Sequence, residues 1–253
     1  AIKECAPGQF EINLLHHDDA LLMADQTFLL KRLIKNCARQ FNMNASFMAK
    51  PFSDEAGNGM HVHLSVVDKD GNNVFTVDKN KQPQGLFSQA IAGLLKTTPD
   101  FLSFYAPHSN SYRRLVHNAD HAPTTLSWGN ENRTALIRLP EASAEATRLE
   151  FRVASADSNP YLVFASVLAS VYAGIQGKLQ HDKETIGNAH AQHPPSLGVT
   201  WREAVEKTSV SSLVKDFFGE QFQQCYTCVK ESEIKRFEST ITDFEYHSYL
   251  RSL

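Results

Sequence analysis

The sequence predicts a mixed α and β domain in which strands do not alternate regularly with helices. Three observations indicate this class: a long helical pattern near the N-terminus, short strand-like segments around charged residues in the middle, and a long apolar helical pattern after them. With 253 residues, 42% of them hydrophobic, the chain is long enough to bury one sizeable core. We therefore expect a single domain over residues 1–253.

The first half of the chain should contain a long helix, a hairpin and a second helix. Apolar residues recur at a helical period in the first segment, with Asp18 or Asp19 as the N-cap, and Pro99 should end the second helix. The expected elements are a helix over 18–41, strands over 45–50 and 60–67, a turn over 68–73 that leads to a returning strand at 74–75, and a helix over 84–97.

The second half begins with a long polar stretch, and loops of that length usually carry function. Pro160 suits the first turn of the helix that follows the middle strands. The expected elements are a loop-rich stretch over 107–132, strands over 134–139 and 148–153, an apolar helix over 160–179, an exposed connection over 183–196, and an amphipathic helix over 231–250.

Bulk properties exclude several classes of partner. A formal net charge of -3 gives no reason to expect nucleic acid or an anionic membrane, so the ligand should be a small molecule. No apolar run approaches the roughly 20 residues that span a bilayer. Four scattered cysteines do not form a disulfide framework, which favours a cytoplasmic protein. The chain opens at Ala1 without methionine, and we interpret it as a fragment.

Arginines are concentrated in the middle of the chain. Between Thr97 and Gly177 there is no lysine, but there are six arginines, at 113, 114, 133, 138, 148 and 152. The planar guanidinium group binds carboxylate and phosphate through two hydrogen bonds at once. This composition therefore predicts an anion site, although surface or ion-paired arginines would give the same pattern.

The spacing of three charged residues sharpens this prediction. Arg148, Glu150 and Arg152 alternate along an expected strand, so their side chains should share one face. A carboxylate between two arginines is either a salt-bridge ladder or a metal ligand beside phosphate-binding arginines. Both interpretations remain open at this point.

Four further residues are candidate metal ligands. His61 and His63 are two apart on an expected strand, about 7 Å from each other on one face, and follow the glycine-containing segment 57–59. Glu4 and Glu11 flank a turn and could share a hard cation such as magnesium or manganese. Taken alone, each pair is more simply explained as ordinary surface or core residues.

Together, these segments resemble the glutamine synthetase family in order and spacing. The matching segments are Glu4-Cys-Ala-Pro-Gly-Gln-Phe-Glu11, Ala49-Lys-Pro51, Gly57-Asn-Gly-Met-His-Val-His63, Asn110-Ser-Tyr-Arg-Arg-Leu115, Asn132-Arg133, Arg138-Leu-Pro140, Arg148-Leu-Glu-Phe-Arg152, Asn159-Pro-Tyr-Leu162 and Phe244-Glu-Tyr. The amino-acid sequences of these motifs most resemble those of the γ-glutamylputrescine synthetase-like members of that family.

The resemblance implies a fold and an assembly. The fold would be the glutamine synthetase/guanido kinase-like α+β catalytic domain, a curved antiparallel sheet flanked by long helices and incomplete at its N-terminus. The family's small N-terminal domain and its Glu-x-Glu strand have no counterpart in residues 1–253. The intact protein would be a homo-oligomeric ring, a dodecamer, and the fragment alone would be inactive.

The resemblance also implies a role for each motif residue. Two Mg2+ or Mn2+ ions would bind per site, with ATP as co-substrate. The implied ligands are Glu4 and Glu11 for the first metal and His61 and Glu150 for the second; ATP and phosphate would contact His63, Ser65, Arg133, Arg138 and Arg148; and glutamate would contact Gly57, Arg114 and Arg152.

The acceptor loop departs from the family pattern. True glutamine synthetases have a glutamate just before Ala-Pro, where this chain reads Asn118-Ala-Asp120-His121-Ala-Pro123, and Ala56 replaces the usual asparagine before Gly57. We therefore expect a glutamate–amine ligase with Arg133, His121 and Asp120 as its catalytic residues, His121 acting as the base. The alternatives are glutamine synthetase proper, which uses ammonia, and a non-catalytic structural member of the family.

Overall fold

The computed structural model describes residues 1–117, 119, 122–197 and 199–251 of the chain. Its strands are β1 Ile2–Lys3, β2 Phe10–Glu11, β3 Val62–Leu64, β4 Thr76–Val77, β5 Pro83–Gln84, β6 Trp128–Asn130, β7 Ile137–Leu139 and β8 Leu149–Phe151. Its helices are α1 Ala20–Gln40, α2 Gly85–Tyr105, α3 Ser109–Arg114, α4 Pro160–Gln176, α5 Ala189–Gln192, α6 Trp201–Val210, α7 Ser212–Phe218, α8 Glu220–Glu238 and α9 Asp243–Tyr249, with a 3-10 turn at Ala144–Ala146. The mixed α and β class predicted from the sequence is confirmed. No helix in the described ranges is long and apolar enough to cross a membrane.

A four-stranded sheet in the order β3-β8-β7-β6 carries three of the predicted site residues, His63, Glu150 and Arg138. The β3–β8 and β8–β7 pairs are antiparallel, as the resemblance implied. The β6–β7 pair is parallel, which the sequence did not predict. The connection between these two strands opens at Glu131, a non-glycine residue with a φ of 50°. The expected loop over 107–132 is therefore wrong in part, because α3 and β6 lie within it.

Two long helices, α2 and α4, pack closely in the core. A Cβ added to Gly93 would lie 2.2 Å from the carbonyl oxygen of Ser170, and one added to Gly174 would lie 2.2 Å from that of Gln89. Thr97 Oγ1 also donates to Ser170 Oγ over 2.7 Å. The two helix backbones therefore meet at a glycine crossing, formed by Gly93 and Gly174, where no side chain separates them.

The prediction that Pro99 ends its helix is wrong, because α2 continues through it to Tyr105. A proline in a helix interior costs about 3 kcal/mol. The turn after Pro99 is buried among aromatic side chains, and this burial outweighs the cost. The Thr98 hydroxyl donates over 2.6 Å to the carbonyl of Leu94, one turn before it.

The C-terminal helices also pack against α2. The Ser103 hydroxyl is 2.8 Å from that of Thr208 on α6, and the Tyr226 hydroxyl on α8 donates to the Ser103 carbonyl over 2.7 Å. The single helix expected over 231–250 is wrong. The chain forms α8 and α9 instead, because Thr242 begins a new helix with a capping box.

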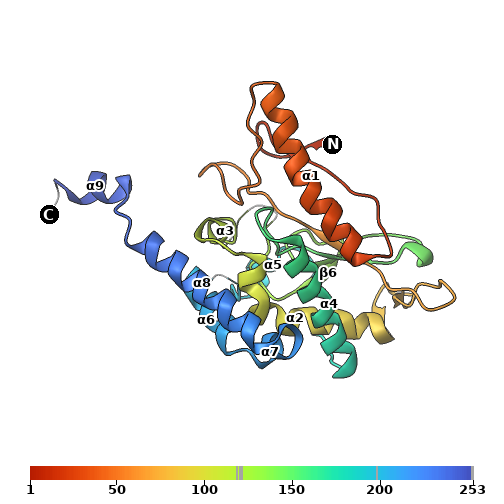
Figure 1. Cartoon of the computed structure of the whole chain (residues 1–253). Helices are drawn as coiled ribbons and strands as arrows, with labels where there is room; N and C mark the ends of the chain where they lie inside the picture. The colour runs from red at the N-terminus through yellow and green to blue at the C-terminus, as the bar shows by residue number, and fades with distance from the viewer. Residues whose placement is uncertain (118, 120–121, 198, 252–253) are drawn as a thin grey trace.

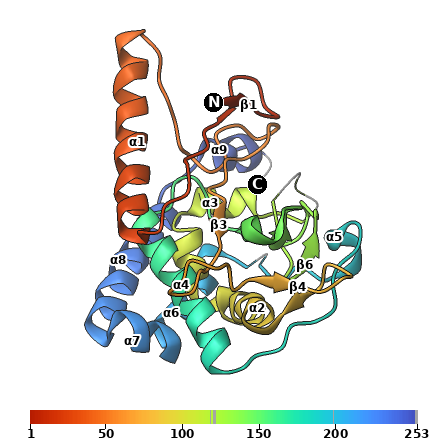
Figure 2. The same ribbon diagram turned by 90° about the vertical axis from the view of Figure 1, so that its right-hand side faces the viewer.

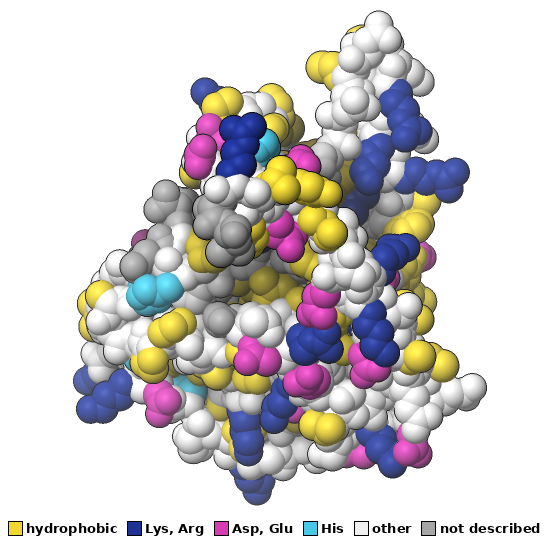
Figure 3. Space-filling view, turned by 90° about the vertical axis from the view of Figure 1, so that its left-hand side faces the viewer, with side chains coloured by type: hydrophobic (Ala, Val, Ile, Leu, Met, Phe, Trp, Pro, Cys, Tyr) yellow, Lys and Arg dark blue, Asp and Glu magenta, His cyan; other side chains and the backbone are white. Residues whose placement is uncertain are grey.

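The helix α9 lies apart from the body of the molecule at the left of Figure 1. None of its residues is buried. Figure 3 shows one face of the molecule, with a hollow near its centre that hydrophobic and acidic side chains border.

The first helix, α1, was predicted correctly, with Asp19 as its N-cap. It lies along one edge of the molecule (Figure 2) and contacts α4. Tyr161 on α4 donates its hydroxyl to Asp25 over 2.5 Å, and Lys31 Nζ donates to the carbonyls of Ala156 and Ser158 over 2.7 and 2.9 Å. These polar contacts attach α1 to the start of α4.

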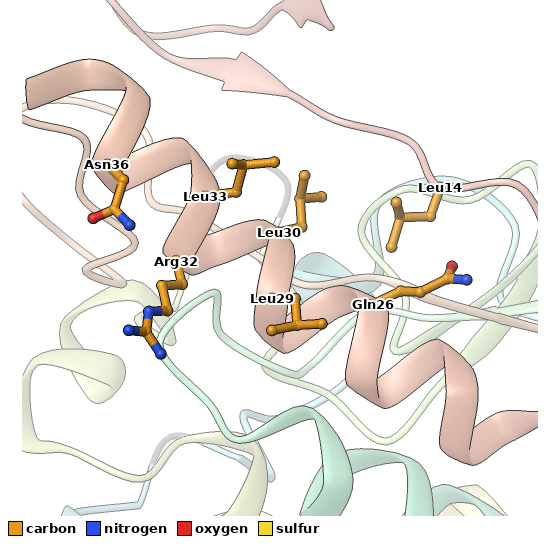
Figure 4. Close-up of a pocket in the computed structure, with 7 residues that line it drawn as sticks. All are labelled: Leu14, Gln26, Leu29, Leu30, Arg32, Leu33 and Asn36. Atoms are coloured by element: carbon orange, nitrogen blue, oxygen red, sulfur yellow. The ribbon is translucent and has the colours of Figure 1, made fainter. Parts of the chain in front are cut away.

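The other side of α1 is exposed and apolar. Figure 4 shows an open hollow of about 530 Å3 there, in which Leu14 faces the helix. The lining residues are Leu14, Gln26, Leu29, Leu30, Arg32, Leu33 and Asn36. None of the residues predicted to bind metal, ATP or glutamate lies in it.

Two other sequence predictions are corrected by the structure. No strand forms over 45–50, because its backbone binds side chains and a loop instead: Lys50 N donates to Asn110 Oδ1, and the Ala49 carbonyl accepts from Asn58 N. The connection over 183–196 contains α5. It is also partly buried, and Thr185 N donates to the Trp128 carbonyl over 2.9 Å. The turn at 68–73 is confirmed, with Val67 and Asn73 paired across it.

Candidate active site

Glu150 lies in the middle of a row of charged side chains across the sheet. In the strand register, Glu150 on β8 is directly opposite His63 on β3 and Arg138 on β7. Residues directly opposite one another on antiparallel strands point to the same face. The register therefore brings together three predicted site residues that are far apart in the sequence.

The carboxylate of Glu150 is saturated by cationic and imidazole groups. Its Oε1 is 3.0 Å from His61 Nδ1 and accepts from Arg152 Nη1 over 2.7 Å, while its Oε2 accepts from Arg138 Nη1 over 2.8 Å. The side chain is only 4% exposed. Burial raises its pKa, but the hydrogen bond from His61 and the charge of Arg152 hold the pKa of Glu150 well below the usual range of a carboxyl group.

The two histidines lie at different distances from this carboxylate. β3 is short, so His61 precedes the strand rather than lying on it. His63 Nδ1 accepts from Arg148 Nε over 3.3 Å, and desolvation lowers the pKa of both rings. Both imidazoles are therefore neutral at neutral pH. Ser65 follows β3 and is exposed.

Arg138 is held between two carboxylates. Its Nη2 donates to Glu131 Oε2 over 2.8 Å, on the side opposite its bond to Glu150, and this bond lowers the pKa of Glu131. Arg133 is exposed and makes no ion pair or hydrogen bond with any described residue. Sequence reasoning missed Glu131, because its contact with Arg138 depends on the turn after β6.

Arg114 is buried at the end of α3. Its Nη1 and Nη2 donate to the main-chain carbonyls of Val153 and Arg152 over 2.9 and 3.0 Å. Burial lowers its pKa to about 10, and the neighbouring charge of Arg152 acts in the same direction. In this structure Arg114 thus supports the end of β8, and its predicted contact with glutamate stays a prediction.

The loop 57–59 packs directly on Arg114. A Cβ on Gly57 would lie 2.9 Å from Arg114 Cγ and 2.8 Å from the Ala49 carbonyl oxygen, and one on Gly59 would lie 2.8 Å from Arg114 Nη2. Glycine is therefore required at both positions by packing. The backbone of Gly57 remains the predicted contact for the amino group of glutamate.

Glu4 and Glu11 are brought together by the hairpin of β1 and β2. The Glu4 amide donates to the Gln9 carbonyl over 3.0 Å, and Glu11 pairs with Ile2. A hydrogen bond with Glu4 raises the pKa of Glu11, desolvation and the Glu4 charge raise it further, and the charge of Glu150 adds to the effect. The hairpin carboxylates therefore lie within electrostatic range of the sheet network.

The donors fit one divalent ion better than two. A carboxylate pair with a raised pKa gains stability from a proton or a hard cation between its members, so Glu4 and Glu11 suit Mg2+ or Mn2+. Glu150 and His61 are already bonded to each other and to arginines. Within the described ranges, no group of three or more His, Cys, Asp or Glu side chains is arranged to hold a metal.

The family-model comparison covers nearly the whole chain. Residues 1–249 match the model described as glutamine synthetase, catalytic domain. The chain belongs to the glutamine synthetase family. The Glu150 network and the hairpin carboxylates both lie within the matched residues. The predicted residues Asp120 and His121 lie outside the described residues.

Several curated proteins are similar over the full chain. The γ-glutamylputrescine synthetase PuuA of Escherichia coli (strain K12) is 36% identical over 252 residues, which is 100% of this chain and 53% of that protein. The glutamate–isopropylamine ligase of a Pseudomonas species is 35% identical, covering 98% and 54%. A glutamine synthetase of Clostridium saccharobutylicum is 36% identical, covering 98% and 57%. The chain spans about half the length of the curated relatives it matches.

A solved structure of GmaS without ligand shares the fold, with a TM-score of 0.80 and 27% sequence identity over 92% of this chain and 54% of that one. The fold implied by the resemblance is thus confirmed at the level of the catalytic domain.

Proposed function

We propose that this protein is an ATP-dependent ligase that joins the γ-carboxylate of glutamate to an amine, as in γ-glutamylputrescine synthetases. In the first step a γ-carboxylate oxygen attacks the γ-phosphorus of ATP, which gives γ-glutamyl phosphate and ADP. In the second step the amine nitrogen attacks the γ-carbonyl carbon, inorganic phosphate leaves, and the nitrogen loses a proton.

The observation that carries this proposal is the charge arrangement around Glu150. Phosphoryl transfer to a carboxylate brings two anions together, so the site must present fixed positive charge before the reaction. Glu150 and Glu131 hold the Arg138 guanidinium from two sides, which fixes its position. The exposed Arg133 has no competing ion pair among the described residues and is free to meet a phosphate.

The hairpin supplies the other half of the proposed site. Mg2+ or Mn2+ held by Glu4 and Glu11 would neutralise and orient the reacting oxygens. His63 and Ser65 lie on the exposed side of β3, where ATP contacts are proposed. Arg152, paired with Glu150 over 2.7 Å, is proposed to act with Arg114 near the glutamate carboxylates.

An amine is proposed as acceptor in preference to ammonia. The acceptor loop lacks the glutamate found before Ala-Pro in true glutamine synthetases, and two of the relatives are ligases that act on putrescine or isopropylamine by name. We propose that His121 accepts the proton from the attacking amine and that Asp120 attracts its distal ammonium group.

The acceptor is tested by phosphate release from glutamate and ATP by the full-length protein, with putrescine, isopropylamine and ammonium compared at equal concentration. Faster release with an amine supports the proposal. Preference for ammonium would assign the protein to glutamine synthetase proper. That function is the second candidate, because one relative at 36% identity is a glutamine synthetase by name. No release with any acceptor, combined with no binding of divalent ions, would favour a non-catalytic family member.

The role of His121 is tested by His121→Ala. Loss of a general base typically slows the dependent step about a hundredfold, so amide formation should fall by that factor. Phosphoryl transfer, followed by positional isotope exchange in labelled ATP, should be nearly unchanged. Equal loss of both steps would remove this role from His121.

A further inference from the structure

Gln9 uses every hydrogen-bonding group of its side chain to join two segments. Its Oε1 accepts from the Ala6 amide over 3.0 Å, which closes the turn within the hairpin. Its Nε2 donates to the Gly57 carbonyl over 3.0 Å and to Asn58 Oδ1 over 2.7 Å. A single amide thus connects the hairpin that carries Glu4 to the loop 57–59.

The loop end of this connection is itself fixed. Asn58 Nδ2 donates to the Met48 carbonyl and Asn58 N to the Ala49 carbonyl, both over 2.7 Å. The Asn58 carbonyl accepts from Ala156 N over 3.1 Å. The side chain of Asn58 therefore has no spare conformation from which to meet Gln9 elsewhere.

The strands of the hairpin are short. Among the described residues, β1 and β2 each contain two residues, form a separate two-stranded sheet and have exposed side chains, while Ala6 in the turn between them is buried. Isolated two-stranded hairpins are marginally stable in water. The position of Glu4 and Glu11 relative to the loop thus depends strongly on the bonds that Gln9 makes.

We propose that Gln9 is a positioning residue that sets the distance between the carboxylate pair Glu4–Glu11 and the glutamate-binding backbone at Gly57. This inference rests on the proposed function, which assigns the divalent ion to Glu4 and Glu11 and the substrate glutamate to the backbone of Gly57. It assigns Gln9 no contact with substrate. Because one amide serves both ends, loss of Gln9 should weaken divalent-ion and glutamate binding together and leave ATP binding almost unaffected.

Three variants of the full-length protein test the assignment. Gln9→Met keeps the length of the side chain and removes both N–H donors and the acceptor. Gln84→Met makes the same chemical change in the β4–β5 hairpin, where, among the described residues, Gln84 Nε2 donates to the Gln82 carbonyl and is exposed. Asn58→Leu removes one of the two partners at the loop end, leaving the Gly57 carbonyl, and allows a double-variant comparison with Gln9→Met.

The expected result is a paired loss. Removing a partner that orients a metal ligand typically costs 10- to 100-fold in affinity, so Gln9→Met should weaken Mn2+ binding and raise the glutamate KM by about tenfold each. The ATP KM and the Tm should stay near those of Gln84→Met. Amide hydrogen exchange should accelerate in residues 4–11 and 57–59. The losses in the double variant should be smaller than the sum of the two single losses, because the Gln9–Asn58 bond is counted in both.

Several results would overturn the assignment. One is that Gln9→Met equals Gln84→Met in all measurements. Another is that its kcat falls with both affinities unchanged. A third is that its Tm and ATP KM change as much as its glutamate KM, which would indicate general destabilisation. Failure of the proposed function is separable, because hydrogen exchange and Mn2+ titration need no turnover. Even if the unaltered protein releases no phosphate, comparing it with Gln9→Met by hydrogen exchange shows whether the hairpin and the loop loosen together.

Discussion

The carboxylates of the candidate site belong to two regions, the sheet that carries Glu150 and the hairpin that carries Glu4 and Glu11. Glu150 is almost fully buried and both of its oxygens are bonded to side chains on three different segments. Glu11 is exposed, and its closest charged neighbours are other carboxylates. The same functional group is thus held by positive partners in one region and opposed by negative ones in the other.

This difference indicates which part of the site is formed before any ligand binds. The sheet network needs no ligand to be stable, because its charges already compensate one another. The hairpin pair is electrostatically unfavourable until a proton or cation joins it. The predictions below test this contrast between a formed region and a region that depends on its ligand.

The largest effect is expected from Glu150→Gln. Glu150→Gln removes the buried negative charge that Arg138 and Arg152 both bond to, which should lower the free energy of unfolding by about 3 kcal/mol. Urea unfolding of the chain measures it. Glu141→Gln is the matched control, because Glu141 makes an exposed ion pair with Lys81 and its loss should barely change stability. Equal midpoints for the two variants would contradict the contrast.

Glu11→Gln should weaken metal binding without lowering stability, in contrast to Glu150→Gln. Its removal relieves repulsion with Glu4, so the urea midpoint should not fall. Binding of Mn2+, measured by titration calorimetry on the full-length protein, should weaken at least about tenfold, since a hard cation loses one anionic oxygen ligand. A loss of stability similar to that of Glu150→Gln would show that the hairpin is also a formed region.

The attachment of α1, the helix that follows the hairpin, gives a smaller effect. Lys31→Met removes two hydrogen bonds to main-chain carbonyls and should cost about 1 kcal/mol. Lys35→Met is the control one turn later: Lys31 and Lys35 lie over the same Phe47 ring, at 5.9 and 5.8 Å, but Lys35 makes neither carbonyl bond. Thermal unfolding should separate the two variants. If they unfold at the same temperature, the ring contact and not the carbonyl bonds attaches the helix.

The smallest effect is a difference in the sign of pH dependence. Glu150 has a depressed pKa when folded, so its contribution to stability is complete above the ordinary carboxyl pKa and is lost as the pH falls toward the depressed value. Glu11 has a raised pKa, so its unfavourable contribution grows as the pH rises through the interval above the ordinary value. Carboxyl chemical shifts followed by NMR between about pH 3 and 7, without divalent ions, should show Glu11 titrating and Glu150 unchanged. Joint titration of the two groups would contradict this assignment.

Much of the sheet region could be predicted from the sequence. Alternation predicted that Arg148, Glu150 and Arg152 share one face, although β8 itself covers only Leu149–Phe151, and the resemblance to the family named His61 and Glu150 as ligands of one metal. The sequence could not reveal Glu131, whose contact with Arg138 depends on a turn with a positive φ. Local spacing describes one strand, whereas the partners across the sheet are set by register.

The helices show a similar limit. The period of α1 and its N-cap were predictable because both are local. The continuation of α2 past Pro99 was not, since it depends on burial by α6 and α8, which pack from elsewhere in the chain. The role of Gln9 was equally hidden. Its motif was visible, but the segment it meets lies 48 and 49 positions further on.

The glycine crossing between α2 and α4 affects how mutational data on this protein should be interpreted. In a saturation scan, Gly93 and Gly174 should tolerate almost no replacement, and a larger residue at one cannot be rescued by a change at the other, because each Cβ would meet backbone of the opposite helix. Two distant positions would then share the profile usually attributed to catalytic residues. Their intolerance would report the spacing of two helix axes, and activity measured per folded molecule would distinguish them from Arg133 or Glu150.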